Sequence, residues 1–261
     1  MDPWRLILDP PSPASYNMAV DEALVDSCRR GASGPTLRLY GWDRPAISLG
    51  YFQRPDQVVD LDLCRDAGVP VVRRTTGGRA VYHRHEVTYS VVAPVPHPCF
   101  PPTIRGTYET IGVALEAALV RLGFRVARRD RDAERVRQAS GSPLCFAATS
   151  RNELTLDGKK VVGSAQRRWP TAFLQHGSIL LRYDPREVSQ FFPAEPDALE
   201  SITGLGAHRE SVTPVEVCQT LVASWERLFG VALRPAALTA DEAAAVAETS
   251  HARDLTVTQP V

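Results

Sequence analysis

The feature that most constrains this chain is a short hairpin with a two-residue turn near the middle of the sequence. Residues 152–156 alternate between polar and apolar side chains, Asp157-Gly158 follows, and residues 159–162 run back. An Asp-Gly pair tolerates positive φ at both turn positions and therefore joins two antiparallel strands. The return strand begins with Lys159-Lys160, and the segment leading into the hairpin contains Cys145. The hairpin can therefore bring a lysine beside the segment that carries a thiol.

Cys145 is a candidate nucleophile for covalent acyl chemistry. The thiolate is the reactive form of cysteine, and a neighbouring positive charge lowers the pKa of the thiol. Three of the other cysteines fall in helical patterns, where free cysteine packs as a small apolar residue, and the fourth lies among prolines; they are Cys28, Cys64, Cys218 and Cys99. From the residues alone, a catalytic and a structural interpretation of Cys145 both stay open.

The two lysines of the return strand cannot have the same role. Because successive side chains of a strand point to opposite faces, one of Lys159 and Lys160 faces the site and the other faces solvent. Their spacing does not decide which one.

A glycine turn between two expected strands is the second candidate for function. Residues 73–83 read RRTTGGRAVYH, and Gly77 and Gly78 allow a close backbone approach and offer amide donors to a ligand. Arg73, Arg74 and Arg79 make the turn cationic. The alternative is a β-hairpin with a solvated arginine tip. The segment is not a P-loop, because it contains no GxxxxGK[ST] pattern.

Histidines and cysteines do not suggest a metal centre. His83 and His85 are close together, but no second cluster has metal-ligand spacing. His176 begins an apolar run, where it either bonds within a site or caps a strand. The five cysteines form no CxxC pair, which argues against a disulfide framework and suits a reducing cytoplasm.

Composition excludes some classes of protein. The 261 residues carry 30 acidic and 30 basic side chains, a balance that argues against a dedicated nucleic-acid binder. No apolar run is long enough to span a bilayer, and the N-terminus has no signal-peptide pattern. We therefore expect a cytoplasmic protein with no membrane or nucleic-acid partner.

The order of strand and helix patterns predicts an α+β fold with mixed or antiparallel sheets flanked by helices. We expect one domain over residues 1–261, in which residues 185–261 form a helical C-terminal part. Thr213 and Thr239 each begin a capping box, and the first of these helices should turn Val217, Leu221, Trp225 and Leu228 inward. Helices are expected at residues 15–28 with Ser15 as the cap, 60–67 and 104–122; strands are expected at residues 4–8, 36–40, 46–50, 69–73, 79–83, 87–92, 124–127, 152–156, 159–162 and 177–182.

Three motifs together resemble one known family. They are RRTTGGRAVYHRHEVTYS at residues 73–90, GKKVVGSAQRR at residues 158–168 and LQHGSILL at residues 174–181. The combination resembles the biotin/lipoate protein ligase fold in its lipoate-attachment branch, over roughly residues 4–185. This resemblance implies a catalytic domain similar to lipoate–protein ligase A.

The resemblance also implies a choice between two activities. In the family the site lysine precedes a V-x-G-[ST]-A run, which implies Lys160. Ligases of the family typically have a third glycine where this chain has Arg79. Cys145, in CFAATS, is similar to the nucleophile of octanoyltransferases found in many Gram-positive bacteria. A Cys-dependent octanoyltransferase is therefore expected, with an ATP-dependent lipoate–protein ligase or an octanoyl amidotransferase as alternatives.

An octanoyltransferase of this kind implies particular substrates and site residues. It would take octanoyl from octanoyl–acyl carrier protein, hold it as a thioester on Cys145, and pass it to a lysine of an apo lipoyl-domain protein. That acceptor would be a glycine cleavage H protein or a dehydrogenase E2 subunit. Lys160 would assist catalysis, no cofactor or metal would be needed, and a monomer is expected. The implied substrate-binding residues are Arg74, Gly77, Gly78, Arg79, His83, Gly163, Ser164 and His176.

Overall fold

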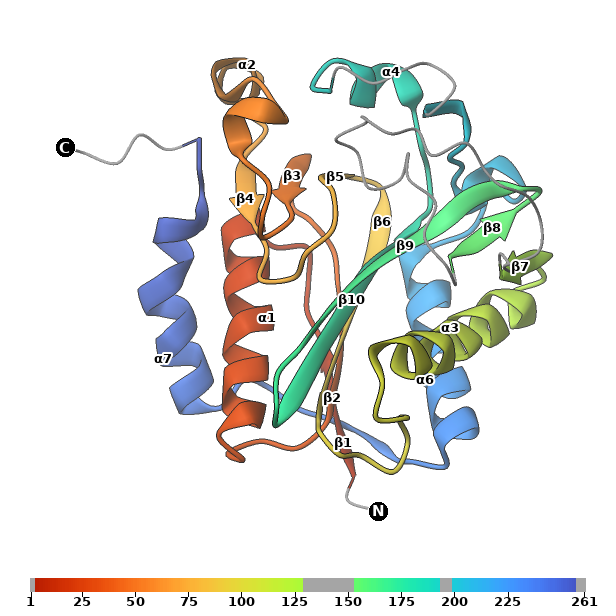
Figure 1. The fold of residues 1–261 in the computed structure, drawn as a ribbon. Coiled ribbons are helices and arrows are strands. Elements are labelled where there is room, and N and C mark those ends of the chain that lie inside the picture. Colours follow the sequence, from red (N-terminus) through yellow and green to blue (C-terminus); the bar gives the residue numbers. More distant parts are fainter. Residues whose placement is uncertain (1–2, 129–152, 193–198, 257–261) are drawn as a thin grey trace.

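The computed structural model describes residues 3–128, 153–192 and 199–256, which Figure 1 shows as a sheet with helices on both sides. Cys145 and most of the segment leading into the hairpin lie outside the described residues. Among the helices of the described ranges, none has the length and apolarity needed to cross a bilayer.

The larger sheet is mixed and has eight strands in the order β11-β1-β2-β6-β10-β9-β8-β7. β1 pairs in parallel with β2 and with β11, and the remaining pairs are antiparallel. The strands are β1 (Trp4–Leu8), β2 (Thr36–Tyr40), β6 (Glu86–Pro94), β7 (Val126–Arg128), β8 (Leu154–Leu156), β9 (Lys159–Arg168), β10 (Ala172–Leu180) and β11 (Leu233–Pro235). The expected α+β class with mixed sheets is confirmed.

A smaller sheet of three strands contains the residues on either side of the glycine turn. Its strands are β3 (Ala46–Leu49), β4 (Val71–Arg73) and β5 (Val81–His83), in the order β4-β3-β5. β3 is parallel to β4 and antiparallel to β5. The hairpin interpretation of the turn is therefore wrong, because β3 lies between the two strands that the turn connects.

Helices cover both faces of the larger sheet. Those on the faces of this sheet are α1 (Ala14–Arg29), α3 (Ile104–Arg121) and α6 (Pro214–Phe229), and α7 (Ala240–Thr249) packs on α1. The short helices α2 (Leu61–Asp66) and α4 (Pro185–Ser189) instead pack against the smaller sheet. Neighbouring residues of β6 divide between the two faces: Val91 belongs to the core under α3 and α6, whereas Val92 belongs to the core under α1. Alternation along β6 therefore places apolar side chains on both sides of a central strand.

The helix ends confirm two capping predictions and correct others. Thr213 and Thr239 form complete capping boxes, as predicted. The N-cap of α1 is Pro13, which makes no side-chain cap, so the assignment of Ser15 as the cap is wrong. On α6, Val217, Leu221 and Trp225 are buried, but Leu228 is 44% exposed because it lies at the edge of the buried face.

The hairpin predicted around Asp157-Gly158 is present in the structure. Asp157 has φ of 49° and Gly158 has φ of 78°, as an Asp-Gly turn requires. Thr155 pairs with Lys160 and Leu156 with Lys159, and a bulge shifts the register between Leu154 and Thr155. Strand β9 continues to Arg168 rather than ending at residue 162, because it also pairs with β10 along its length.

Candidate functional site

A narrow cavity between the two sheets gathers five of the residues predicted for the site. They are Arg74, His83, Gly163, Ser164 and His176, and Met18, Tyr40, Trp42, Val81 and Thr88 complete much of the lining. The volume of the cavity is about 30 Å³, whereas a cavity that holds benzene has a volume of about 150 Å³. An acyl chain would therefore enter only if lining side chains move outward.

One wall of this cavity is a hydrogen-bonded relay centred on Glu86. His83 lies between Ser48 and Glu86: its Nε2 is 2.7 Å from the Ser48 hydroxyl and its Nδ1 is 2.9 Å from Glu86 Oε1. Thr88 and Ser178 also donate to Glu86 Oε1, at 2.6 and 2.7 Å. Burial alone would raise the pKa of Glu86, but the charge and hydrogen bond of His83 and the two hydroxyl donors hold it below its usual value.

A second relay, centred on His176, forms the neighbouring wall. His176 Nδ1 is 2.8 Å from Asp21 Oδ2 and its Nε2 is 2.7 Å from the Thr76 hydroxyl. Burial lowers the pKa of His176 below its usual value, although Asp21 opposes the shift. A neutral ring that donates from Nδ1 to Asp21 and accepts from Thr76 satisfies both contacts. Arg38 donates a hydrogen bond to Asp21 at 2.8 Å. Burial alone would raise the pKa of the Asp21 carboxyl, but His176 and Arg38 together hold this pKa below its usual value.

Arg74 connects the cavity to the glycine turn. It is buried, and its guanidinium donates to the carbonyls of Ser48, Gly77 and Arg79 at 2.9, 2.9 and 2.7 Å. These bonds brace the turn from inside. Arg74 therefore has a structural role in addition to its place in the cavity lining.

The glycines of the turn differ in what the backbone requires of them. Gly78 has φ of 92°, a conformation that favours glycine, whereas Gly77 has room for a side chain. The close approach is made by Gly50, where a Cβ would lie 1.9 Å from the carbonyl oxygen of Gly78. Sequence reasoning did not identify Gly50, because its contact comes from the glycine turn, which lies beyond β3 and β4 in the chain.

Lys160 lies on the same strand as Gly163 but is not one of the cavity-lining residues in the described ranges. Its side chain is almost fully buried, and its Nζ is 2.5 Å from Glu153 Oε1. Lys159 is exposed, so Lys160 is the lysine whose ammonium lies inside the protein. The backbone of Lys160 also bonds Ser201 and Thr203, which fixes this part of β9 against the segment before α6.

Glu153 is a site residue that sequence reasoning missed, although the signal was present. An Asp-Gly turn pairs Thr155 with Lys160, and side chains two residues apart on a strand share a face. Glu153 and Lys160 therefore had to be diagonal neighbours on one face. Asp21 and Glu86 were also missed; no local pattern relates Asp21 to His176.

The four cysteines in the described residues are poorly suited to nucleophilic chemistry. Burial raises the pKa of the thiols of Cys28, Cys64 and Cys218 to about 11, and burial also raises the pKa of Cys99. A raised pKa reduces the thiolate fraction at neutral pH. Among the described residues, no cluster of three His, Cys, Asp or Glu side chains is arranged to hold a metal ion.

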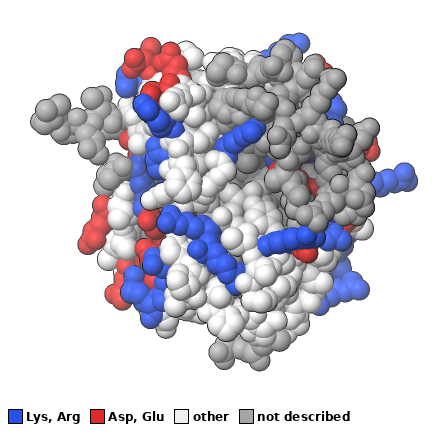
Figure 2. Space-filling view, viewed as in Figure 1, with Lys and Arg blue, Asp and Glu red and all other residues white. Residues whose placement is uncertain are grey.

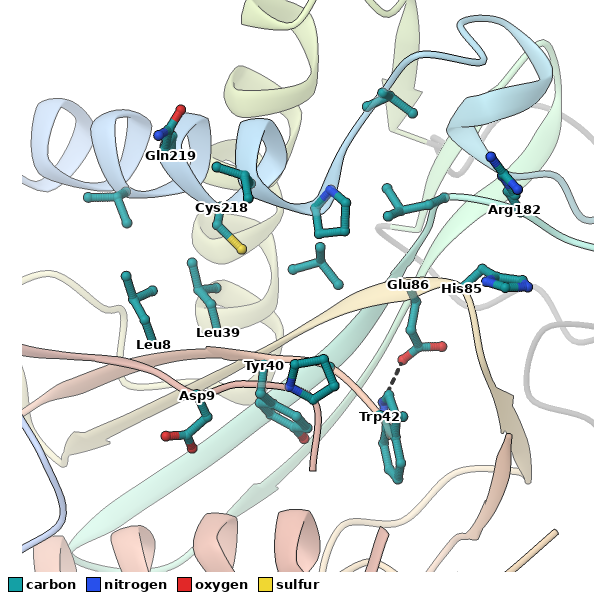
Figure 3. Close-up of a pocket in the computed structure, with 18 of the residues that line it drawn as sticks. Leu8, Asp9, Leu39, Tyr40, Trp42, His85, Glu86, Arg182, Cys218 and Gln219 are labelled. Atoms are coloured by element: carbon teal, nitrogen blue, oxygen red, sulfur yellow. Dashed lines mark hydrogen bonds between the residues drawn. The ribbon is translucent and has the colours of Figure 1, made fainter. Parts of the chain in front are cut away.

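A larger groove, of about 790 Å³, lies between the sheet and α6, on the other side of Trp42 (Figure 3). Leu8 and Leu39 face Cys218 across it. Tyr40 and Trp42 line both this groove and the narrow cavity. Trp42 stacks on His83 with ring centroids 3.8 Å apart and donates to Glu86 at 3.1 Å. The two aromatic side chains therefore form a partition between the two spaces.

The chain is similar over most of its length to one family of known proteins. Residues 13–225 match the model of the lipoyl protein ligase A/B catalytic domain. The chain is 41% identical over 256 residues to octanoyltransferase LipM of Kyrpidia tusciae, with 93% of each chain covered. It is 35% identical to octanoyltransferase LipM of Geobacillus kaustophilus, with 96% of this chain and 95% of the relative covered.

Solved structures show the same fold at lower sequence identity. A crystal structure of lipoate-protein ligase A bound with ATP has a TM-score of 0.80 and 24% identity, covering 96% of this chain and 95% of its own. A putative lipoate protein ligase from T. acidophilum with bound lipoic acid has a TM-score of 0.77 and 24% identity, covering 95% of this chain and 94% of its own.

Proposed function

Because the chain belongs to the lipoyl protein ligase A/B catalytic-domain family, we propose that it is an octanoyltransferase that modifies lipoyl domains in lipoate biosynthesis. The observation that carries the proposal is its similarity, over nearly the whole length of both chains, to relatives named octanoyltransferase LipM. The proposal takes residues 1–261 as one catalytic domain. In support, β11 from the C-terminal part extends the main sheet beside β1, and α6 packs against α3.

The proposed donor is octanoyl–acyl carrier protein, and the proposed nucleophile is Cys145. The thiolate attacks the carbonyl of the donor thioester, a new carbon–sulfur bond forms, and the carrier leaves as its thiol after taking a proton. The lysine amine of the lipoyl domain then attacks the enzyme thioester. An amide forms, the bond to the Cys145 sulfur breaks, and the amine proton returns to the thiolate. Because the first step exchanges one thioester for another, no ATP is required.

Lys160 supplies a positive charge to this chemistry in our proposal. Its ammonium lies on the hairpin that follows Cys145 in the chain, and Glu153 holds it in a buried ion pair. A preorganised cation in a buried site stabilises a developing oxyanion more strongly than the same cation in water. Because Glu153 accepts from the ammonium, it orients the group and can also help Lys160 to relay a proton.

The cavity between the sheets is the proposed site for the acyl chain. Gly163, Ser164 and His176 would line its walls, with Arg74 and the turn at Gly77-Gly78 at its rim. Burial of each methylene contributes about 0.8 kcal/mol, so five or six methylenes would contribute about 4–5 kcal/mol. The ligase alternative is less well supported, because Arg79 stands where ligases typically have a third glycine near the nucleotide.

The proposed acceptors are apo lipoyl domains, and we place the reaction in the cytoplasm with the protein acting as a monomer. Five cysteines without a CxxC pair suit a reducing compartment. Measuring the molar mass of the enzyme in solution over a range of protein concentrations tests whether it is a monomer.

A mass measurement on apo lipoyl domain tests the proposed function. The domain is incubated with enzyme and one of three donors: octanoyl–acyl carrier protein without ATP, free octanoate or lipoate with ATP and magnesium, or an octanoylated lipoyl domain of different mass. We expect modification with the first donor, and its loss in Cys145→Ala. Modification only with the second donor, surviving Cys145→Ala, would establish a ligase. Modification only with the third would establish an amidotransferase.

A further inference from the structure

Alternating aromatic and arginine side chains form a ridge on the surface of the described residues. The Phe52 ring lies edge-on against Tyr51, with centroids 5.0 Å apart. The Arg167 guanidinium lies 4.6 Å from the centre of the Tyr51 ring and 4.8 Å from that of Trp169. Arg29 lies 5.3 Å from the Trp169 ring. We call these five residues the aromatic–arginine ridge.

The loop that carries the aromatic end of the ridge is held firmly in place. Arg73 donates to the carbonyls of Gly50, Tyr51 and Gln53, at 3.2, 3.0 and 2.6 Å. The Tyr51 amide donates to the carbonyl of Thr76 at 2.9 Å. Phe52 is nevertheless 88% exposed. The chain therefore fixes the position of an aromatic side chain that it does not bury.

The ridge begins at the rim of the acyl cavity. Gly50 packs directly against Gly78 of the glycine turn. Thr76, which accepts from the Tyr51 amide, also bonds the cavity residue His176. Arg167 donates to the carbonyl of Thr75, so both ends of the Tyr51–Arg167 stack are attached to the same turn. A partner on the ridge would therefore lie beside the glycine turn and the cavity that it borders.

The chemistry of the ridge indicates the chemistry of its partner. Tyr51, Phe52 and Arg29 are exposed, whereas Arg167 and Trp169 are partly buried. Aromatic and arginine side chains are the residue types that dominate binding energy at protein interfaces. An arginine stacked on an aromatic ring keeps its charge and its hydrogen-bond donors. Figure 2 shows basic side chains gathered across the centre of one face, over β9 and β10, although the net charge of the chain is zero. The complementary surface is acidic and has an apolar hollow for Phe52.

We propose that the aromatic–arginine ridge is the docking surface for the acidic carrier protein that delivers the acyl thioester. This inference rests on the proposed function and adds to it the surface on which the donor binds. The carrier protein is a better candidate for this surface than the acceptor lipoyl domain, because the thioester of the carrier is at the end of a long pantetheine arm. A carrier on the ridge can reach the cavity from beside it, whereas a lipoyl domain must bring a short lysine side chain directly over the entrance.

Two donors that carry the same acyl group distinguish an effect on carrier docking from an effect on the transfer reaction. Octanoyl–acyl carrier protein has a protein surface, and octanoyl-pantetheine has none. We expect Phe52→Ala to lower kcat/KM for the carrier-borne donor about tenfold to thirtyfold and to leave kcat/KM for octanoyl-pantetheine within about twofold. Leu8→Ala is the matched control, because Leu8 is 59% exposed on the far side of the partition at Trp42. It should change neither value.

Direct binding gives a readout that does not depend on activity. Calorimetry should show that octanoyl–acyl carrier protein binds the wild type, that binding weakens as salt rises, and that Phe52→Ala weakens it by a similar factor. Unchanged binding in Phe52→Ala, or equal losses with both donors, would overturn the docking surface. Comparable binding of a single-stranded oligonucleotide through Phe52 would also overturn it. If the wild type bound the carrier through Phe52 but transferred octanoyl from neither donor, the surface would stand and the proposed function would fail.

Discussion

The ammonium of Lys160 in β9 and the carboxylate of Glu153, directly before β8, face one another across the hairpin, with Nζ 2.5 Å from Oε1 and both side chains at least 96% buried. A buried ion pair adds little to stability when compared with well-packed apolar residues of similar size. Removal of only one partner is costly, since it leaves the other charge uncompensated. Stability therefore gives no reason for this buried pair, and our proposal assigns its ammonium a role in the chemistry instead.

The Lys160–Glu153 pair gives the first prediction. Lys160→Ala should lower octanoyl transfer by about 10²–10⁴-fold and lower the free energy of unfolding by about 3–5 kcal/mol. The double variant Lys160→Met/Glu153→Met should recover most of the stability without recovering transfer, because no buried charge is left unpaired. Lys159→Ala is the control for the exposed neighbour and should cost little. Recovery of transfer in the double variant would show that Lys160 has only a structural role.

The second prediction identifies the nucleophile. Ser48, His83 and Glu86 are connected as a hydroxyl–imidazole–carboxylate series, so a serine ester is the specific competitor of a Cys145 thioester. Octanoyl–acyl carrier protein should add one octanoyl mass that hydroxylamine removes. That mass should be absent in Cys145→Ser and present in Ser48→Ala and Cys99→Ser. A hydroxylamine-resistant adduct that disappears in Ser48→Ala would assign the acyl group to the serine.

The third prediction concerns pH and the His176 relay. Burial lowers the pKa of His176 below its ordinary 6.5, so the unfolded chain binds this proton more readily than the folded chain. The free energy of unfolding should therefore fall as pH decreases below about 6.5, with a slope of at most about 1.4 kcal/mol per pH unit from this group. Burial also lowers the pKa of His97. His97 should therefore contribute to the same fall in the free energy of unfolding as pH decreases.

Comparison with a variant isolates the contribution of His176. His176→Gln keeps a hydrogen bond to Asp21 and cannot titrate, so denaturant unfolding between pH 7 and pH 5 should show a smaller slope than in the wild type. The lowered pKa values of Asp21 and Glu86 predict a further loss in both proteins as pH falls through the usual carboxyl range toward these lowered values. Identical slopes above pH 5 would mean that His176 is not held neutral in the folded state.

The fourth prediction concerns acyl chain length. Tyr40 and Trp42 separate the narrow cavity from the groove beside α6, so Trp42→Ala should connect the two spaces. The ratio of kcat/KM for a twelve-carbon donor to that for an eight-carbon donor should rise about tenfold or more, since each methylene that enters is worth about 0.8 kcal/mol. Trp42→Phe retains a ring and should keep the preference of the wild type. An unchanged ratio in Trp42→Ala would place the end of the acyl chain elsewhere.

Some features of the fold could be predicted from short stretches of sequence. The Asp157-Gly158 turn predicted the hairpin, and alternation along it was sufficient to place Glu153 and Lys160 on one face, although that step was not taken. The capping box at Thr213 predicted where α6 begins. Each of these features depends on interactions among residues a few positions apart, where the backbone geometry of a turn or a helix end decides the outcome.

Other features were decided only by the tertiary structure. The insertion of β3 between β4 and β5 made the alternative interpretation of the glycine turn, as a β-hairpin, wrong, and it brought Gly50 against Gly78. Asp21 and His176 are 155 residues apart in the chain, yet their side chains are hydrogen-bonded, and the contact opposes the effect of burial on the pKa of His176. Turn chemistry and periodicity act over a few residues, and they specify the elements. Which elements become neighbours depends on how both faces of β6 and β10 are buried together, and that is a property of the whole packed core.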